Sequence, residues 1–351
     1  MKLDDLLHQT GEWLKGVGPN SEIVISSRMR LARNLKGVPF AHWSNKKESE
    51  KVFAMVKPAI LESGLMKDAL FLKIQDLSNI DKQFLLERHL VSRELITGSD
   101  SKAVAISPNE VISVMVNEED HLRIQAMESG FNLKDAWEVI NSLDDELSQK
   151  LDYAFSVDFG YLSACPTNTG TGLRASVMAH LPALVLTKQI EKVLHAISKI
   201  GLTARGFYGE GTEASGNFFQ ISNQVTLGLP ELEVIDNLGR IIRQVIEHEL
   251  SARQLLTSQQ KELLHDRIWR SYGTLKSAYI ITSKEAVELL SSVRLGVDLG
   301  MINGVDGKLL NELLVVIQPA HLQKLEAKAL DAAQRDVKRA DLIRQKLTSK
   351  D

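Results

Sequence analysis

Apolar residues recur along this chain of 351 residues in two patterns, and the first predicts β-strands. Three short apolar runs lie within residues 103–127, where polar turns at 108–110 and 117–120 separate them. Gaps this short join antiparallel neighbours, because a parallel crossover needs a dozen or more residues. Further strands are predicted at 22–26, 202–208 and 217–228, with a short one at 278–283. We therefore expect an antiparallel sheet.

The second pattern, apolar positions spaced three and four apart, predicts helices. It covers residues 1–16, 47–65, 79–96, 133–155 and 173–200, and nearly everything from about residue 236 onward. Strands and helices do not alternate one by one, so the fold expected is α+β: an antiparallel sheet flanked by helices, followed by a small helical C-terminal domain. The parts expected are an N-terminal helix (1–20), a sheet-containing domain (21–252) and a helical domain (253–351).

Composition narrows the class of protein. The chain is 44% hydrophobic and 25% charged, which is enough apolar content for a folded core. Its net charge of −3 offers no bulk positive field for nucleic acid or an anionic membrane. One cysteine excludes an internal disulfide, and neither a long apolar run nor a signal-peptide pattern occurs. We expect a soluble cytoplasmic protein that binds neither nucleic acid nor membrane.

Five arginines border predicted turns or strand ends and are candidates for binding phosphate. Arg28 and Arg30 follow the strand predicted at 22–26 and face the same way at a period of two. Arg123 lies on a predicted strand, Arg174 follows a glycine-rich turn expected to open a helix, and Arg205 precedes another glycine turn. Singly, each would more often be a solvated surface residue. Together they predict a phosphate clamp, because guanidinium binds phosphate oxygens with two donors and keeps its charge.

Three carboxylates and one thiol are candidates for the chemistry. Glu118 and Glu119 lie in a polar turn, which is either a solvated hairpin tip or a carboxylate pair that orients a cation and accepts its proton. Glu210 lies between two glycines, as in a loop that approaches a ligand closely. Cys165 is either a small buried apolar residue or a thiol in an anion-binding turn. Nucleophilic catalysis by Cys165 is not favoured, because no recognisable histidine partner accompanies it.

Familiar nucleotide and metal motifs do not fit this chain. Residues 170–175 match G-x-G-x-x-A, but loop residues and not a parallel strand precede them, which argues against a dinucleotide site. The sequence contains no P-loop, no H-E-x-x-H and no paired C-x-x-C, so no metal site is predicted.

A basic segment near the C-terminus, RDVKRA at 335–340, lies in a predicted helix. Arg335 and Arg339 are four residues apart, so they share one face, and their mutual repulsion would be relieved by a bound anion. The alternative is a solvated basic face. The apolar stripe of the same helix is Ala333, Val337, Ala340, Ile343 and Leu347.

Five segments together resemble the catalytic half of the phosphagen (guanidino) kinases, in the family's order and at compatible spacing. They are SSRMRLARN (26–34), NEEDHLR (117–123), CPTNTGTGLR (165–174), RGFYGEG (205–211) and GNFFQISN (216–223). Metabolite-type members carry a separate small helical domain before this part and lack an RDVKRA-like extension. On both counts the chain is similar to the McsB family of bacterial protein-arginine kinases, and that resemblance spans the whole chain.

The resemblance implies roles for these residues. Glu119 would be the catalytic base, steadied by Glu118; Glu210 would grip the acceptor guanidinium; and Cys165 would lie beside it as an electrostatic helper. The implied ATP-binding residues are Ser26, Ser27, Arg28, Met29, Arg30, His89, Arg123, Arg174, Ala175, Ser176, Val177, Met178, Arg205, Gly206, Phe207, Tyr208, Gly209 and Glu210. The implied allosteric phosphoarginine-binding residues are Arg335, Asp336, Arg339 and Ala340.

The activity implied is ATP-dependent phosphorylation of arginine side chains in proteins, with Mg²⁺ held through the phosphates. Stress-response regulation and protein degradation would be its setting. Its implied partners are substrates with exposed arginines, an activator protein, a stress-response repressor or an unfoldase–protease machine, and a second copy in a homodimer. Two alternatives stay open, a small-molecule guanidino (arginine) kinase and a phosphoarginine-binding adaptor with an inactive kinase domain. The short N-terminal part disfavours the first, and the intact Glu119 and Glu210 disfavour the second.

Overall fold

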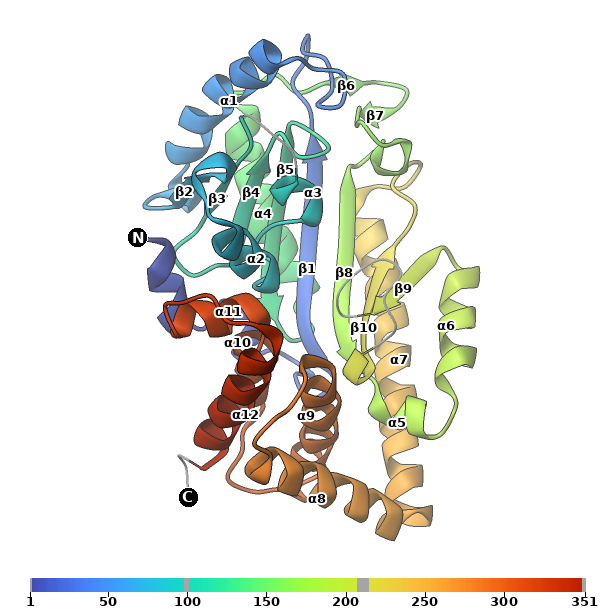
Figure 1. The fold of residues 1–351 in the computed structure, drawn as a ribbon. Coiled ribbons are helices and arrows are strands. Elements are labelled where there is room, and N and C mark those ends of the chain that lie inside the picture. The colour runs from blue at the N-terminus through green and yellow to red at the C-terminus, as the bar shows by residue number, and fades with distance from the viewer. Residues whose placement is uncertain (1, 98–100, 207–214, 349–351) are drawn as a thin grey trace.

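The computed structural model describes residues 2–97, 101–206 and 215–348. Its main element is an eight-stranded sheet in the order β2-β3-β4-β5-β1-β8-β10-β9, whose neighbours all pair antiparallel (Figure 1). These strands are β1 (Val24–Arg33), β2 (Leu70–Lys73), β3 (Ala103–Ile106), β4 (Ile112–Val116), β5 (Leu122–Ser129), β8 (Leu173–His180), β9 (Leu202–Gly206) and β10 (Phe218–Asn223). A separate hairpin pairs β6 (Phe155–Ser156) with β7 (Gly160–Tyr161). The predicted α+β class with an antiparallel sheet is confirmed.

The helices flank this sheet and form the C-terminal region. The α-helices are α1 (Lys46–Leu61), α2 (Asn79–Glu87), α3 (Arg93–Ile96), α4 (Leu133–Ser148), α5 (Pro182–Leu186), α6 (Ile190–Lys199), α7 (Glu231–Gln259), α8 (Lys261–Ser277), α9 (Ser283–Asp298), α10 (Gly307–Val316), α11 (Pro319–Leu325) and α12 (Ala332–Thr348). The 3₁₀ turns are η1 (Leu3–His8), η2 (Glu12–Leu14), η3 (Gly64–Met66), η4 (Ile74–Asp76), η5 (Pro166–Asn168) and η6 (Ser215–Asn217). None of the helices within the described ranges is long and apolar enough to cross a membrane.

Strand β1 lies in the middle of the sheet, and its alternating side chains separate the core from the opposite face. Met29 and Leu31 are fully buried on the face that α4 covers, while α7 packs behind β8 and β10 (Figure 1). Arg28 and Arg30 point to the other face, because successive strand side chains alternate. The pairing register sets Arg30 opposite Arg174 of β8. Neighbouring strands therefore place guanidinium groups side by side on one face.

The C-terminal helices pack directly against the sheet-containing part. At the start of α11, the Glu87 carboxylate accepts hydrogen bonds from the backbone N–H groups of Ala320 and His321, at 2.8 and 3.0 Å. On α9, Arg294 donates to the backbone oxygen of Ser21 at 2.6 Å. Helix α11 thus lies beside α2 and η1, and α10 lies beside η2, whereas α12 packs against α8 and α11 (Figure 1).

Several sequence-based expectations for secondary structure are corrected. Residues 173–200 do not form one helix: the first eight are strand β8, because β1 and β10 pair with it on both sides, and only then do α5 and α6 follow. The strand expected at 22–26 extends to residue 33, β2 was not expected, and residues 278–282 form a loop, not a strand. Residues 1–16 form two 3₁₀ turns, not one helix, and 79–96 form two helices. The predicted domain boundary at 252/253 lies within α7 and stays a prediction.

A buried ion pair joins β1 to α4. Arg33, which is 2% exposed, donates from Nε and Nη2 to one Asp144 carboxylate oxygen at 3.0 and 2.7 Å. Its guanidinium also lies 3.5 Å from the ring centroid of Tyr161. Gly172, at φ +65°, leaves room for this arrangement, since a Cβ there would lie 2.7 Å from the Arg33 guanidinium. These contacts hold the end of β1 against α4 and against β7, and Arg33 also donates to the backbone oxygen of Thr171, just before β8, at 2.9 Å.

We expect Asp144→Ala to lower the free energy of unfolding by about 3–5 kcal/mol, because it leaves the Arg33 charge buried and uncompensated. Chemical denaturation measures this difference. The matched control is Asp152→Ala, which removes an exposed ion pair to Lys36 and should cost below about 1 kcal/mol. Equal costs for the two variants would contradict the role given to the buried pair.

Candidate active site

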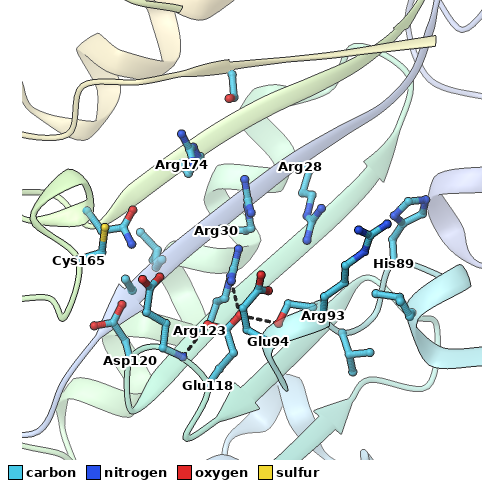
Figure 2. Close-up of a pocket in the computed structure, with 18 of the residues that line it drawn as sticks. Arg28, Arg30, His89, Arg93, Glu94, Glu118, Asp120, Arg123, Cys165 and Arg174 are labelled. Carbon is cyan, nitrogen blue, oxygen red and sulfur yellow. Dashed lines mark hydrogen bonds and ion pairs between the residues drawn. The ribbon is translucent and has the colours of Figure 1, made fainter. Parts of the chain in front are cut away.

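A cavity of about 840 Å³ lies over the open face of the sheet, and five arginines from four strands line it. They are Arg28 and Arg30 on β1, Arg123 on β5, Arg174 on β8 and Arg205 on β9. Figure 2 shows the first four with their guanidinium groups gathered over neighbouring strands. The structure therefore brings together all five arginines that the sequence singled out.

The crowding of positive charge in this cavity is only partly offset. Burial, followed by repulsion from Arg123, lowers the pKa of Arg28 to about 9. Burial and three neighbouring guanidinium groups hold the pKa of Arg30 well below its usual value. Among the described residues, the buried Nε atoms of Arg28 and Arg30 have no hydrogen-bond partner. Unsatisfied buried donors beside like charges favour a bound polyanion, which supplies both acceptors and negative charge.

One carboxylate of the acidic turn belongs to the arginine cluster. Glu118 forms an ion pair with Arg123 and accepts hydrogen bonds from the Ser92 hydroxyl and the Glu119 backbone N–H (Figure 2). Although burial opposes it, the attraction of Arg123 and these donors keep the pKa of Glu118 below its usual value. Glu118 is therefore a fixed anion that orients Arg123.

The neighbouring carboxylate has the opposite character. Glu119 is exposed on the wall of the same cavity, and its pKa is raised by partial desolvation and by repulsion from Asp120 and Glu118. A carboxylate with a raised pKa is a better proton acceptor. Asp120 holds the turn in place, since its Oδ1 accepts from Asn34 Nδ2 at 2.6 Å and from the Ala164 N–H at 2.7 Å. Asn117, Glu118 and Asp120 are buried and only Glu119 of this turn is exposed, so the turn is not a solvated hairpin tip.

Cys165 lines the same cavity, on the loop that Asp120 anchors through Ala164. It is partly exposed, and its Sγ lies 3.0 Å from the hydroxyl oxygen of Thr167 (Figure 2 shows it beside Asp120). The thiol is therefore neither a fully buried apolar residue nor remote from the carboxylates.

His89 lies at the far end of the cavity from Cys165 (Figure 2). It follows α2 with a φ of +59°, and its ring packs edge-on against Trp13, with centroids 5.3 Å apart. Burial and the charge of Arg28 lower its pKa to about 3, so the imidazole is neutral at pH 7. Ser26, Ser176 and Met178 line a small side cavity next to His89. A neutral, partly apolar end of this kind suits a nucleotide base better than its phosphates.

Several other residues that were expected to bind ATP do not line this cavity. Ser27, Met29, Ala175 and Val177 face the opposite side of the sheet in the core, so they can support the site only through the backbone. Gly206 ends β9, where it pairs with Phe219. Phe207, Tyr208, Gly209 and Glu210 lie outside the described residues.

The turn before Arg174 was wrongly expected to open a helix. Arg174 is the second residue of strand β8, so no helix N-terminus lies there to attract an anion. The glycine at 172 serves close packing against β1, where a Cβ would lie 2.6 Å from the Ala32 backbone oxygen. The positive charge at this point comes from side chains alone.

The structure adds residues that the sequence did not single out. Arg93, Glu94 and Lys102 line the cavity near Glu118, and Gln318 reaches it from just before α11. Ser92 caps α3 by accepting from the Leu95 N–H at 3.1 Å. A serine followed by two charged residues at a helix start is a capping signal, but it gives no indication of the distant acidic turn.

In the C-terminal motif, Arg339 is 1% exposed and donates to the backbone oxygens of Ile317 and Ile281 at 2.9 and 3.0 Å. It also forms an ion pair with Asp336, and Ala340 is buried beside it. Arg335 and Asp336 are partly exposed. Of the expected apolar stripe, Ala340, Ile343 and Leu347 are buried, whereas Ala333 and Val337 are exposed, Val337 at 45%. The alternative of a uniformly solvated basic face is wrong, because Arg339 is buried and its hydrogen bonds attach α12 to the segments at Ile281 and Ile317.

Comparison with known proteins begins with two families. Residues 51–252 match the family described as ATP:guanido phosphotransferase, C-terminal catalytic domain. Among solved structures, a taurocyamine kinase from Schistosoma mansoni has a TM-score of 0.61 at 24% identity, covering 71% of this chain and 38% of that one. A lombricine kinase has a TM-score of 0.59 at 24% identity, covering 69% of this chain and 72% of that one. Fold and site together thus define a guanido phosphotransferase.

The C-terminal residues and two relatives of nearly full length point to a narrower family within the guanido phosphotransferases. Residues 261–351 match the family described as Protein-arginine kinase McsB C-terminal domain. The protein-arginine kinase of Halothermothrix orenii is 51% identical over 348 residues, covering 99% of both chains. That of Desulforamulus reducens is 49% identical over 341 residues, covering 96% of both. This chain therefore belongs to the protein-arginine kinase family.

We expect Glu119→Gln to lower turnover by about 10²–10⁴-fold, because the amide keeps the size of the side chain but accepts no proton. Since the pKa of Glu119 is raised, the wild-type rate should increase as pH rises through that pKa and Glu119 loses its proton. That limb of the pH–rate profile should vanish in the variant, while ATP binding measured by calorimetry persists. Near-wild-type turnover would remove Glu119 from the role of base.

We expect Cys165→Ser to leave reduced but measurable turnover, because a hydroxyl keeps a polar group of similar size near the acceptor but lacks the polarisable sulfur. Mass spectrometry of the enzyme stopped during turnover should detect no adduct at residue 165. Thr167→Val is a useful companion, since it removes only the hydroxyl that contacts Sγ. A covalent intermediate at Cys165 would refute the electrostatic role.

Proposed function

We propose that this protein transfers the γ-phosphoryl group of ATP to the guanidinium of arginine side chains in proteins. The observation that carries the proposal is the pairing, in one cavity, of five arginines with a carboxylate of raised pKa. The arginine cluster suits the phosphates, and the carboxylate suits a cationic acceptor. Membership of the protein-arginine kinase family supports protein arginine as that acceptor.

The chemistry follows from the properties of guanidinium. Its charge is spread over three nitrogens and its pKa is about 13, so it is a poor nucleophile until a carboxylate localises the charge and takes a proton. In the proposed step an arginine nitrogen attacks the γ-phosphorus, the N–P bond forms, and the bond from phosphorus to the bridging oxygen breaks to release ADP. Glu119 accepts the proton that the nitrogen loses, while Glu118 stays ionised and holds Arg123.

The arginines act by position and charge. Phosphoryl transfer proceeds through a loose, in-line transition state, so fixed cations around the phosphates provide most of the catalysis. Two strands hold Arg28, Arg30 and Arg174 in register, which keeps their positions fixed during the reaction. Mg²⁺ bound with ATP would neutralise further phosphate charge, and we propose that the phosphates, not protein carboxylates, hold it. Among the described residues no group of three or more His, Cys, Asp or Glu side chains could hold a metal ion.

The direct test is incubation with ATP, Mg²⁺ and an unfolded, arginine-containing protein. We expect acid- and heat-labile phosphate on arginine, identified by mass spectrometry under neutral conditions, and far slower formation of it with Glu119→Gln. Free arginine assayed in parallel distinguishes a small-molecule kinase, for which it would be the better acceptor.

We further propose that the start of α12 binds phosphoarginine as a regulatory site. Arg335 can pair with the phosphoryl oxygens, and Asp336 can accept from the guanidino nitrogens. Because Arg339 is buried and hydrogen-bonded to two loops, we propose that it positions Asp336 and does not supply a second free phosphate ligand. Ala340 would support the site only by packing.

We expect Arg335→Lys to weaken phosphoarginine binding by about tenfold or more, because lysine lacks the planar fork of donors. Asp336→Ala should leave basal turnover intact but abolish any response to added phosphoarginine. Calorimetry with free phosphoarginine measures binding, and Lys338→Ala, which removes a surface ion pair to Glu326, is the control. Unchanged binding by a folded Arg335→Ala/Asp336→Ala variant would remove the pocket from this helix.

The cellular setting extends the same proposal. A protein-arginine kinase would act in the cytoplasm on proteins with exposed arginines, with an activator protein and with a stress-response repressor or an unfoldase–protease machine that reads the mark. The proposed homodimer would use apolar surface of the C-terminal helices, where Leu263 and Trp269 of α8 are 71% and 48% exposed.

A further inference from the structure

Two exposed apolar segments flank the loop that carries Cys165. The first is the β6–β7 hairpin, whose side chains Phe155, Val157 and Phe159 are 58%, 95% and 56% exposed. The second follows β10, where Val225 and Leu227 are 52% and 49% exposed. Large apolar side chains gathered in this way, away from the core, are typical of a binding surface.

The two segments are joined through the Cys165 loop itself. Tyr161 of the hairpin pairs with Gly170, through backbone bonds of 2.8 and 3.2 Å. On the other side of the loop, the Thr171 N–H donates to the backbone oxygen of Thr226 at 2.9 Å. The two backbone segments lie so close together that a Cβ on Gly170 would be 2.3 Å from the backbone oxygen of Thr226. Hairpin, loop and post-β10 segment therefore lie side by side, at the upper end of the sheet in Figure 1.

This surface is also fixed relative to the acidic turn. The backbone oxygen of Leu162 accepts from Asn34 Nδ2 at 3.0 Å, and the same amide donates to Asp120. The N–H of Ala164 donates to Asp120 as well. The hairpin therefore continues directly into the part of the cavity where Glu119 and Cys165 lie.

We propose that Phe155, Val157, Phe159, Val225 and Leu227, called here the apolar rim, bind an unfolded segment of the protein substrate on either side of its target arginine. An arginine that reaches Glu119 keeps its own backbone within one side-chain length, so the flanking residues must cross the surface around Cys165. Folded proteins bury most of their large apolar residues, whereas an unfolded segment presents them. The apolar rim thus selects arginines in unfolded, apolar-rich chains.

This inference rests on the proposed function, and a pair of peptides tests the two separately. One peptide carries arginine between leucine and valine residues, and the other carries it between glycine and serine. We expect the wild-type enzyme to phosphorylate the first with the higher kcat/KM. If it phosphorylates neither peptide, the proposed function fails; if both react equally well, only the apolar rim is refuted.

The variants are Val157→Ser/Phe159→Ser on the hairpin and, independently, Leu227→Ser. Each should lower kcat/KM for the apolar peptide by about tenfold, mainly through KM, because burying even part of such side chains contributes to binding. The glycine–serine peptide should change less than about twofold, since it offers little apolar surface to bury. Val17→Ser is the matched control: Val17 is 75% exposed and lies at the opposite end of β5 from the acidic turn.

Two changes in behaviour, and also the absence of any change, would overturn the proposal. One is an equal loss for both peptides, which would mean that the substitutions disturb the loop and not peptide binding. The other is a change in oligomeric mass by light scattering without a change in peptide preference, which would identify a second copy of this chain as the occupant. Unchanged kinetics in both variants would likewise remove the apolar rim from substrate binding.

Discussion

The repulsion between buried guanidinium groups is the constraint on which the rest of this structure depends. Arg28, Arg30 and Arg174 lie on adjacent strands. Burial lowers the pKa values of the first two, and repulsion from neighbouring guanidinium groups, Arg123 among them, lowers these values further. Such a cluster is unfavourable without a bound anion, so the packing of the surrounding sheet must keep the guanidinium groups in place. A central sheet with one face in the core provides that rigidity. A bound polyanion would relieve this repulsion and would itself be held in a defined position.

The acidic turn shows how one local structure produces two kinds of carboxylate. Glu118 is turned into the arginine cluster and is kept ionised by Arg123, whereas Glu119 is turned toward the cavity, where neighbouring acids raise its pKa. Two adjacent residues of one chemical type can therefore serve as a fixed anion and as a base. Asp120 anchors the turn to the Cys165 loop, so the base, the thiol and the adjoining surface are positioned by one hydrogen-bond network.

The end of α2 ties this site to the C-terminal helices. Glu87 accepts from the first turn of α11, Arg88 is paired with Glu110 in the interior, and His89 lines the cavity. Three consecutive residues thus contact three parts of the molecule. Because Arg339 of α12 donates to Ile317, two residues before α11, the helical region is continuous with the catalytic part through packed, hydrogen-bonded structure.

The sequence by itself determined the antiparallel strands within 103–127, the α+β class and the five arginines, because short-range periodicity and turn chemistry are local properties. Family resemblance in the motifs added the reaction. Only the tertiary structure decided that residues 173–180 are a strand, since alanine and methionine favour helix locally and pairing with β1 and β10 overrides them. It also decided the burial of Arg339, the opposite pKa shifts of Glu118 and Glu119, and the exposure of the hairpin around Val157. Each of these depends on which segments, far apart in the sequence, lie close together in the fold. Charge, burial and pairing between such segments produce no periodic pattern in the sequence.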